Sequence, residues 1–207
     1  ISRVEGTLTI GQKAVMITAN NQSKVYGQAN PVLTFSYEGL LEGDTQIQTE
    51  PSISTEASIS SNVGSYEITL SGGSDPNYDF TLVNGTLSVT PATLTITADD
   101  KSKVYGESNP PLTFSYAGLV NGDSGIAVEP SVTSGASANS IVGTYDITLT
   151  GGSDPNYAIT RENGTLSVTP ASLTVTADDQ SKIYGEANPS LTFTYSGLLN
   201  GDTQVST

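Results

Sequence analysis

Residues 85–98 read Gly-Thr-Leu-Ser-Val-Thr-Pro-Ala-Thr-Leu-Thr-Ile-Thr-Ala. On both sides of Pro91, apolar residues alternate with serine or threonine, which is the period of a β-strand with one buried face. Proline fixes its own φ angle and biases the residue before it toward extended geometry. The stretch therefore predicts two consecutive strands that are joined stiffly at Pro91, with almost no linker.

The same stretch recurs 79 residues later, at residues 164–177. When residues 12–90 are placed over residues 91–169, 47 of 79 positions are identical without a gap. The sequence thus predicts residues 1–11 as the last strand of a preceding repeat, residues 12–90 and 91–169 as two full repeats, and residues 170–207 as the first half of a third. A unit of this length suits a small domain repeated in tandem. The structural boundaries could instead be offset from the sequence period, with strands shared between neighbours.

Each repeat is predicted to be mainly β, because further alternating segments occur at residues 112–116, 145–149 and 166–168. About six strands per repeat permit a two-sheet sandwich or a β-grasp-like sheet around one short helix. The one helical candidate is Tyr116–Asp123, which could hold a single turn. Asn84-Gly85, between two apolar runs, is a strong β-hairpin signal. The expected fold is an array of tandem small β domains, shaped like a rod because the joins are tight.

The composition excludes several classes of function. The chain carries 21 acidic and 7 basic residues, a net charge of −14, and it has no lysine or arginine cluster to bind nucleic acid. It has no cysteine and no histidine, which removes thiolate chemistry and the usual general base. No apolar run is long enough to cross a membrane. Glu50 and Glu129 recur before prolines, but a two-carboxylate active site repeated in every small domain would be unusual. We therefore predict no catalytic residue, no cofactor, no nucleic acid partner and no membrane insertion.

A Tyr-Gly-x-x-Asn-Pro motif occurs once in each repeat. Its glycine would adopt a backbone angle denied to other residues, and its tyrosine would cover the edge of the core with the hydroxyl at the surface. The alternative is a patch of tyrosine and asparagine that binds sugars. The motif residues are Tyr26, Gly27, Asn30 and Pro31, then Tyr105, Gly106, Asn109 and Pro110, then Tyr184, Gly185, Asn188 and Pro189.

Acidic residues recur at matching positions and raise the question of calcium. Calcium requires about six to eight converging oxygens, whereas no segment has a dense Asp-x-Asp-x-Asp ladder, and Asn20 and Asn21 replace the acids at the first junction. Solvated turns and caps are therefore the favoured interpretation. The recurrent acids are Asp44, Asp123 and Asp202, Asp75 and Asp154, and Asp99, Asp100, Asp178 and Asp179; the calcium alternative rests on Asp44, Asp75, Asp123 and Asp154.

One lysine precedes each Tyr-Gly pair: Lys24, Lys103 and Lys182. A buried lysine beside an asparagine and an acid could form an intramolecular amide crosslink. The favoured interpretation is an ordinary surface lysine that neutralises a nearby carboxylate, which contributes little to stability.

The ordered series of motifs resembles a known family. Each repeat carries Lys-Val/Ile-Tyr-Gly-x-x-Asn-Pro and then Leu-Thr-Phe-Ser/Thr-Tyr-x-Gly-Leu-x-x-Gly-Asp. The full repeats continue with Val-Gly-x-Tyr-x-Ile-Thr-Leu and Asn-Gly-Thr-Leu-x-Val-Thr-Pro-Ala. This series resembles the MBG domain of the YGX type over essentially the whole chain. The resemblance implies mostly β, glycine-rich domains in tandem arrays of large bacterial surface proteins and adhesins, and it brings no catalytic residues.

The function implied by this resemblance is that of a non-catalytic stalk repeat. It would be secreted and displayed at the bacterial cell surface, would contact neighbouring repeats in the same chain, and would hold a distal functional head away from the cell. The alternative is an adhesive module that itself binds host or biofilm glycan or protein. Variation between the repeats concentrates at residues 53–62 against 132–141, a Ser-rich stretch that could be a binding loop or a tolerant one.

Overall fold

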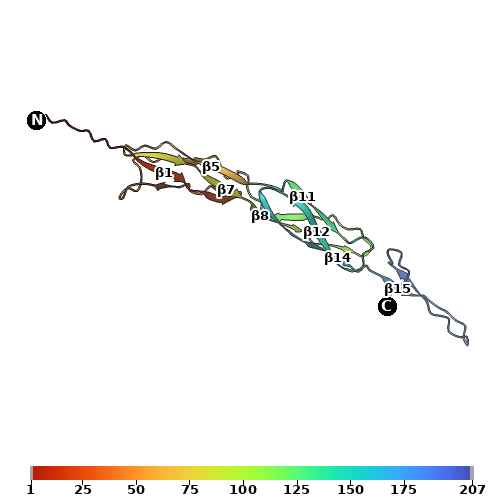
Figure 1. Cartoon of the computed structure of the whole chain (residues 1–207). Helices are drawn as coiled ribbons and strands as arrows, with labels where there is room; N and C mark the ends of the chain where they lie inside the picture. Colours follow the sequence, from red (N-terminus) through yellow and green to blue (C-terminus); the bar gives the residue numbers. More distant parts are fainter. Residues whose placement is uncertain (1, 206–207) are drawn as a thin grey trace. The chain divides into compact units, whose positions relative to one another are not determined.

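The computed structural model describes residues 2–205, and these residues form β-strands, turns and loops without a helix (Figure 1). The first repeat has a three-stranded sheet of order β3-β1-β6 and a four-stranded sheet of order β2-β7-β5-β4. Both sheets are mixed, because β1 pairs antiparallel with β3 but parallel with β6, and β7 pairs antiparallel with β5 but parallel with β2. The strands are β1 (Lys13–Ala19), β2 (Gln22–Val25), β3 (Phe35–Glu38), β4 (Ser52–Thr55), β5 (Gly64–Ser71), β6 (Tyr78–Val83) and β7 (Gly85–Thr90).

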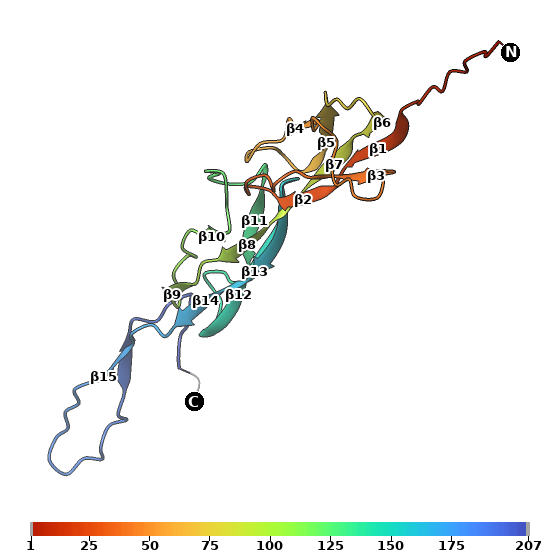
Figure 2. The ribbon, with the colours of Figure 1, turned by 90° about the vertical axis from the view of Figure 1, so that its left-hand side faces the viewer.

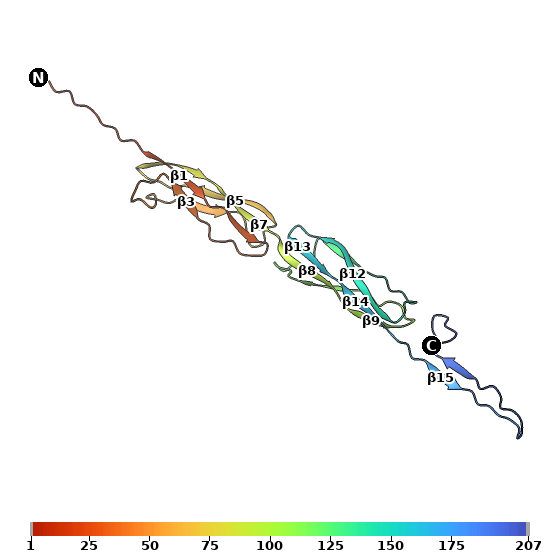
Figure 3. The same ribbon diagram turned by 60° about the horizontal axis from the view of Figure 1, so that its bottom comes forward.

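The second repeat has the same two strand orders, β10-β8-β13 and β11-β12-β14-β9. Figure 3 labels β8, β9, β12, β13 and β14 of this repeat. The register is also the same, since Thr18 pairs with Ser36, Thr97 with Ser115 and, in the third copy, Thr176 with Thr194. Identical residue patterns thus give identical pairings in each copy. The strands are β8 (Ala92–Ala98), β9 (Lys101–Val104), β10 (Phe114–Ala117), β11 (Val128–Ser134), β12 (Gly143–Ser153), β13 (Tyr157–Glu162), β14 (Gly164–Thr169), β15 (Thr174–Ala177) and β16 (Phe193–Ser196).

The core of the first repeat lies between its two sheets. Alternate residues of β1 point inward, so that Ile17 is fully buried with Ile68 of β5 and Leu87 of β7. This arrangement is the two-sheet sandwich. The mainly β prediction is confirmed, whereas the β-grasp alternative with a short helix is wrong for the described residues. The remaining buried members of this core are Val15, Ala19, Ile47, Ala57, Leu70 and Tyr78.

The predicted helical turn at Tyr116–Asp123 is wrong. Its first two residues, Tyr116 and Ala117, lie in β10, and the chain then turns with φ angles of 57° at Asn121 and 80° at Gly122. Both angles are left-handed and cannot continue a right-handed helix.

The hairpin predicted at Asn84-Gly85 is also wrong. The strands on either side, β6 and β7, belong to different sheets, so the chain crosses from one layer of the sandwich to the other. Gly85 is required by a close approach, because a Cβ atom there would lie 2.5 Å from the carbonyl oxygen of Ala19. Asn84 uses its side-chain oxygen to accept a hydrogen bond from the backbone N–H of Leu70 at 3.1 Å.

The prediction of consecutive strands around Pro91 is confirmed, since Pro91 alone separates β7 from β8. The chain divides into two compact units. The first comprises Ile1–Thr93, Gly118–Ser124 and Asp154–Ala158; the second comprises Leu94–Ala117, Gly125–Ser153 and Ile159–Thr207.

Residues 2–12 precede β1 as an exposed segment in which the structure describes no strand (Figure 2). Their assignment to the last strand of a preceding repeat stays a prediction. Residue 1 of that predicted strand, and residues 206 and 207 of the predicted third repeat, lie outside the described residues.

Candidate functional site at the Tyr-Gly motif

The Tyr-Gly motif begins where strand β2 ends. The backbone N–H of Tyr26 donates to the carbonyl of Thr90 at 2.8 Å, and Gln28 N–H donates to the carbonyl of Val25 at 3.0 Å, which closes a turn. Glycine is required in this turn, because φ is 81° at Gly27, and the same is true of its counterparts in the other repeats. The predicted backbone role of the motif glycine is confirmed at 87° for Gly106 and 90° for Gly185. The prolines Pro31, Pro110 and Pro189 are half-buried and lie outside the strands.

Asn30 and Lys24 hold the Ser-rich loop that follows β4. The Asn30 amide donates to the carbonyl of Ala57 at 2.6 Å. The Lys24 ammonium donates to the carbonyls of Ser58 and of Gln28, the latter at 3.0 Å. Asn109 and Lys103 make the same contacts in the second repeat.

Lys24 is therefore a buried clamp. Its side chain is only 5% exposed, and burial lowers the pKa of its ammonium. The interpretation as a surface lysine is wrong for Lys24 and for Lys103, which is also 5% exposed. Among residues 2–205, neither forms an ion pair with a carboxylate. Lys182 is exposed and donates to Asn188 Oδ1 at 2.7 Å. The amide crosslink, the less favoured interpretation of these lysines, stays untested.

The Tyr26 hydroxyl is engaged with residues far along the sequence but inside the same compact unit. It donates to Asp123 Oδ2 at 3.2 Å, and the hydroxyl of Tyr157 donates to the same oxygen at 2.6 Å. The two tyrosine rings meet edge to face with centroids 5.6 Å apart. We call Tyr26, Asp123 and Tyr157 the Tyr-Asp-Tyr cluster. Tyr26 is 6% exposed, so the prediction that its hydroxyl lies at the surface is wrong.

Asp123 and Tyr157 are also tied to the backbone of the turn beside them. The N–H of Val120 donates to the Tyr157 hydroxyl at 3.0 Å. A Cβ atom on Gly27 would lie 2.6 Å from Val120 Cγ2. The glycine thus serves both the left-handed turn and the close approach of Val120.

A second copy of this contact lies in the second compact unit. Tyr105 donates to Asp202 Oδ2 at 3.2 Å, and a Cβ atom on Gly106 would lie 2.8 Å from Leu199 Cδ1. An open pocket of about 760 Å³ is lined by this pair together with apolar side chains such as Ile141 and Leu173 and polar ones such as Gln204.

The remaining counterparts of these tyrosines are Tyr78 in the first repeat and Tyr184 in the third. In the first repeat, Tyr78 donates to Asp44 Oδ2 at 2.5 Å and accepts from Leu41 N–H at 3.1 Å. In the third repeat, the Tyr184 side chain is fully exposed, at 103%.

Ionisation of Tyr157 is opposed by its surroundings. Burial raises the pKa of Tyr157 to about 12, and the hydrogen bond to the Asp123 carboxylate acts in the same direction. The hydrogen bond to Asp44 similarly raises the pKa of Tyr78.

We expect the folded protein to lose stability as the pH rises from about 10 to about 12. Tyrosine in the unfolded chain ionises near pH 10, whereas Tyr157 in the folded chain ionises near 12. The contribution of protonated Tyr157 is complete below the lower value and is lost as the pH passes through the higher one. Urea midpoints across this range for the native sequence and Tyr157→Phe would check this, because the variant should decline less steeply. Equal slopes would contradict it.

The calcium candidates serve as hydrogen-bond acceptors. Asp44 and Asp123 accept from tyrosine hydroxyls, as described above. Asp75 accepts from the N–H groups of Asn77 and Gln48, both at 2.8 Å, and these bonds lower its pKa, the Asn77 bond most. Asp154 accepts from the N–H of Asn156 at 2.8 Å. Within the described part of the chain, no three acidic side chains gather in a way that could hold a metal ion.

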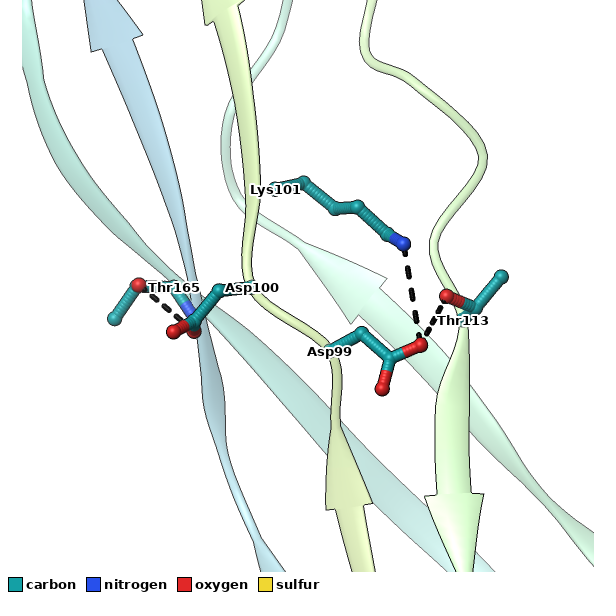
Figure 4. A network of polar contacts seen from close by, with 5 residues as sticks. All are labelled: Asp99, Asp100, Lys101, Thr113 and Thr165. Atoms are coloured by element: carbon teal, nitrogen blue, oxygen red, sulfur yellow. Dashed lines mark hydrogen bonds and ion pairs between the residues drawn. The ribbon is translucent and has the colours of Figure 1, made fainter.

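The acids near the junction point to opposite sides of the chain (Figure 4). Asp99 accepts from the Thr113 hydroxyl at 2.5 Å and pairs with Lys101 at 3.9 Å. Asp100 accepts from the Thr165 N–H at 2.7 Å and from its hydroxyl at 2.9 Å, and the backbone bond is the main reason that the pKa of Asp100 is lowered.

Asparagines make the equivalent contacts in the first repeat. Asn20 donates to the Thr34 hydroxyl at 2.9 Å, and Asn21 accepts from the Thr86 N–H at 2.8 Å. A neutral amide thus replaces a carboxylate without loss of the contact, which favours the interpretation of these positions as caps. In the third repeat, Asp178 N–H donates to the Thr192 carbonyl at 3.0 Å.

The carboxylates considered for catalysis contact tyrosines. Tyr37 donates to Glu50 Oε1 at 3.4 Å, and Tyr116 donates to Glu129 in the second repeat. Burial is the main reason that the pKa values of Tyr37 and Tyr116 are raised.

A family model for the MBG domain (YGX type) matches residues 15–88, 94–167 and 173–207. The chain belongs to this family. The matched segments place one Tyr-Gly motif in each MBG repeat, so the predicted family and its tandem repetition are confirmed. No curated protein matches the MBG chain. Within the described residues of the MBG repeats, none of the segments is a helix with the length and apolarity that a membrane crossing requires.

Proposed function

We propose that this chain is a non-catalytic stalk segment of a large bacterial surface adhesin, secreted and displayed outside the cell, which holds a distal functional head away from it. The observation that carries the proposal is the use of the recurrent polar residues. The side chains of Lys24, Asn30 and Tyr26 donate hydrogen bonds to other atoms of the same chain. Polar groups that already have hydrogen-bond partners within the fold are not free to bind a ligand or to react. Such residues are expected in a repeated structural domain rather than in a binding or catalytic surface.

Two further properties support a stalk. The net charge of −14 keeps a long array soluble, and the absence of cysteine with a single methionine limits oxidation outside the cell. The single residue between β7 and β8 leaves little backbone freedom at the join between repeats.

The alternative is an adhesive module that binds glycan or protein through the variable Ser-rich loop. Its exposed positions differ between the repeats, for example Glu56 against Gly135 and Ser60 against Asn139. The loop backbone, however, is fixed by the clamp from Lys24 to the Ser58 carbonyl. Variable side chains on a fixed loop would be the place to look for a ligand, so the test below includes binding.

We expect small-angle X-ray scattering of the 207-residue chain to give an elongated particle, and glycan and matrix-protein arrays to give no signal. An insertion of six Gly/Ser residues at Pro91 should broaden the distance distribution, because it frees the join. The same insertion between Thr45 and Gln46, which are exposed and lie outside the strands, is the matched control and should leave the distribution unchanged. A freely jointed native chain would contradict the stalk, and saturable binding to an array that is lost on exchange of the loop would favour the adhesive module.

A further inference from the structure

The three tyrosines of the Tyr-Gly motif differ greatly in burial. Tyr26 is 6% exposed, Tyr105 is half-buried, and Tyr184 is 103% exposed. The local backbone is the same in each case, since the following glycine has φ between 81° and 90°. The difference lies in the partners: Tyr26 contacts both Asp123 and Tyr157, Tyr105 donates to Asp202 at 3.2 Å, and Tyr184 is exposed.

The spacing of these contacts identifies the partner. Both tyrosine–aspartate pairs span 97 residues, which is one 79-residue repeat plus 18 residues. The aspartate therefore always belongs to the Gly-Asp turn of the repeat after the one that carries the tyrosine. Asn156 adds to this contact, because its side chain accepts from the Val63 N–H at 2.9 Å and donates to Asn62 Oδ1 at 3.2 Å.

We infer that the Tyr-Gly motif is a docking element by which each MBG repeat binds the next one along the chain. The receiving surface consists of the Gly-Asp turn and the tyrosine of the Ser-Asp-Pro-Asn-Tyr segment. We call this surface the docking socket; in the second repeat it is formed by Val120, Asp123 and Tyr157.

The glycine of the motif fits this role. A Cβ atom would lie 2.6 Å from the socket residue Val120 at Gly27 and 2.8 Å from Leu199 at Gly106, but would meet nothing within 4 Å at Gly185. The motif glycine therefore makes room for the socket wherever a socket is present.

The first repeat presents the same socket, and among the described residues no Tyr-Gly motif forms a hydrogen bond with it. Leu41, Asp44 and Tyr78 repeat the hydrogen bonds of Val120, Asp123 and Tyr157 with the same sequence separations. The occupant that fits is the Tyr-Gly motif of a preceding MBG repeat. Residues 6–10, which read Gly-Thr-Leu-Thr-Ile, match the last strand of a repeat, and the end of that strand holds the Tyr-Gly motif in the first and second repeats.

Docking of this kind couples the stabilities of neighbouring repeats, as nearest-neighbour contacts do in repeat proteins. Loss of the Tyr26 hydroxyl should therefore loosen residues 118–124 and 154–158, which lie about one repeat further along the chain. A hydrogen bond to a carboxylate that is worth about 1.5–3 kcal/mol corresponds to a roughly ten-fold or larger increase in local opening.

Hydrogen exchange measured by mass spectrometry on the full chain tests the coupling. Tyr26→Phe, which keeps the ring, should speed exchange at residues 118–124 and 154–158 about ten-fold. Tyr184→Phe is the matched control and should change nothing. Asp123→Ala should also expose the loop around Val63, whereas Asp44→Ala, which removes the same local tyrosine contact, should act only within the first repeat. Exchange changes confined to residues 22–34 in Tyr26→Phe would overturn the inference.

The free socket is tested by adding one copy of residues 12–90 in front of Gln12. Exchange at residues 41–44 should slow, and Tyr→Phe in the added motif should abolish the slowing. Unchanged exchange would overturn the assignment of the socket to a preceding repeat. Exchange at residues 41–44 that slows with protein concentration in the chain without the added copy would also overturn it, in favour of a second copy. Both readouts are independent of whether the array acts as a stalk.

Discussion

Replacing Ile68 with alanine is expected to lower the free energy of unfolding of the first repeat by about 2–5 kcal/mol. Ile68 is fully buried between the two sheets, where it belongs to one core with Ile17 and Leu87. The substitution removes apolar contacts and leaves a cavity, because a sandwich that is held by hydrogen bonds in both sheets cannot close around it. Urea or guanidinium unfolding followed by circular dichroism measures the change.

The chain provides both a replicate and a control for this substitution. Ile147 is the counterpart in the second repeat and is equally buried. Ile147→Ala should therefore lower the free energy of unfolding of the second repeat by a similar amount. Ile59 is 55% exposed, and Ile59→Ala should change stability by less than about 0.5 kcal/mol. A loss below about 1 kcal/mol for Ile68→Ala, or equal losses for Ile68→Ala and Ile59→Ala, would show that the core is not where the two-sheet sandwich places it.

Gly85→Ala is expected to lower the free energy of unfolding by about 1–3 kcal/mol. The added Cβ atom would lie 2.5 Å from the carbonyl oxygen of Ala19. That oxygen belongs to the backbone at the end of β1 and cannot move without disturbing the pairing of β1 with β3. The cost arises from steric overlap and not from backbone strain, because the φ angle of Gly85 is not positive.

Gly64→Ala is the matched control for Gly85→Ala. Gly64 also begins a strand without a positive φ angle, but its Cβ atom would meet only Tyr66 Cε2, at 3.9 Å. This substitution should be neutral or slightly stabilising, because alanine restricts the unfolded chain. Thermal unfolding of the two variants side by side gives the comparison. Equal midpoints would mean that the crossing at Gly85 tolerates a side chain.

Local patterns predicted the local features correctly. Alternation in Leu94-Thr95-Ile96 predicted a strand that lies in β8, with Leu94 and Ile96 buried. The recurrence of glycine after Tyr26 predicted the positive φ angle of Gly27. Both inferences depend only on neighbouring residues, and each pattern occurs in all three repeats.

Features that depend on distant partners could not be predicted in the same way. Asn84-Gly85 has the composition of a hairpin turn, but the choice between a turn and a crossing depends on which sheet completes the pairing of β7. Lysine is usually a surface residue, and the burial of Lys24 depends on the carbonyl of Ser58, which accepts a hydrogen bond from its ammonium. The partner of Tyr26 lies 97 residues away, beyond any periodicity of a strand. The equal spacing of the Tyr-Gly and Gly-Asp motifs was visible, but no local rule connects them.

The composition of the first compact unit has a practical consequence for protein engineering. Anyone who expresses residues 12–90 as a single repeat, following the 79-residue period, removes the segments 118–124 and 154–158 that complete this unit. In such a fragment Tyr26 would lose its contacts with Asp123 and Tyr157, so its ring would be exposed to solvent. The C-terminal end of the fragment would also be more mobile than it is in the whole chain. A recombinant fragment that ends at Thr169 or beyond keeps β13 and β14, which complete the two sheets of the second repeat, and is the better starting point for crystallisation or for fusion to a cargo.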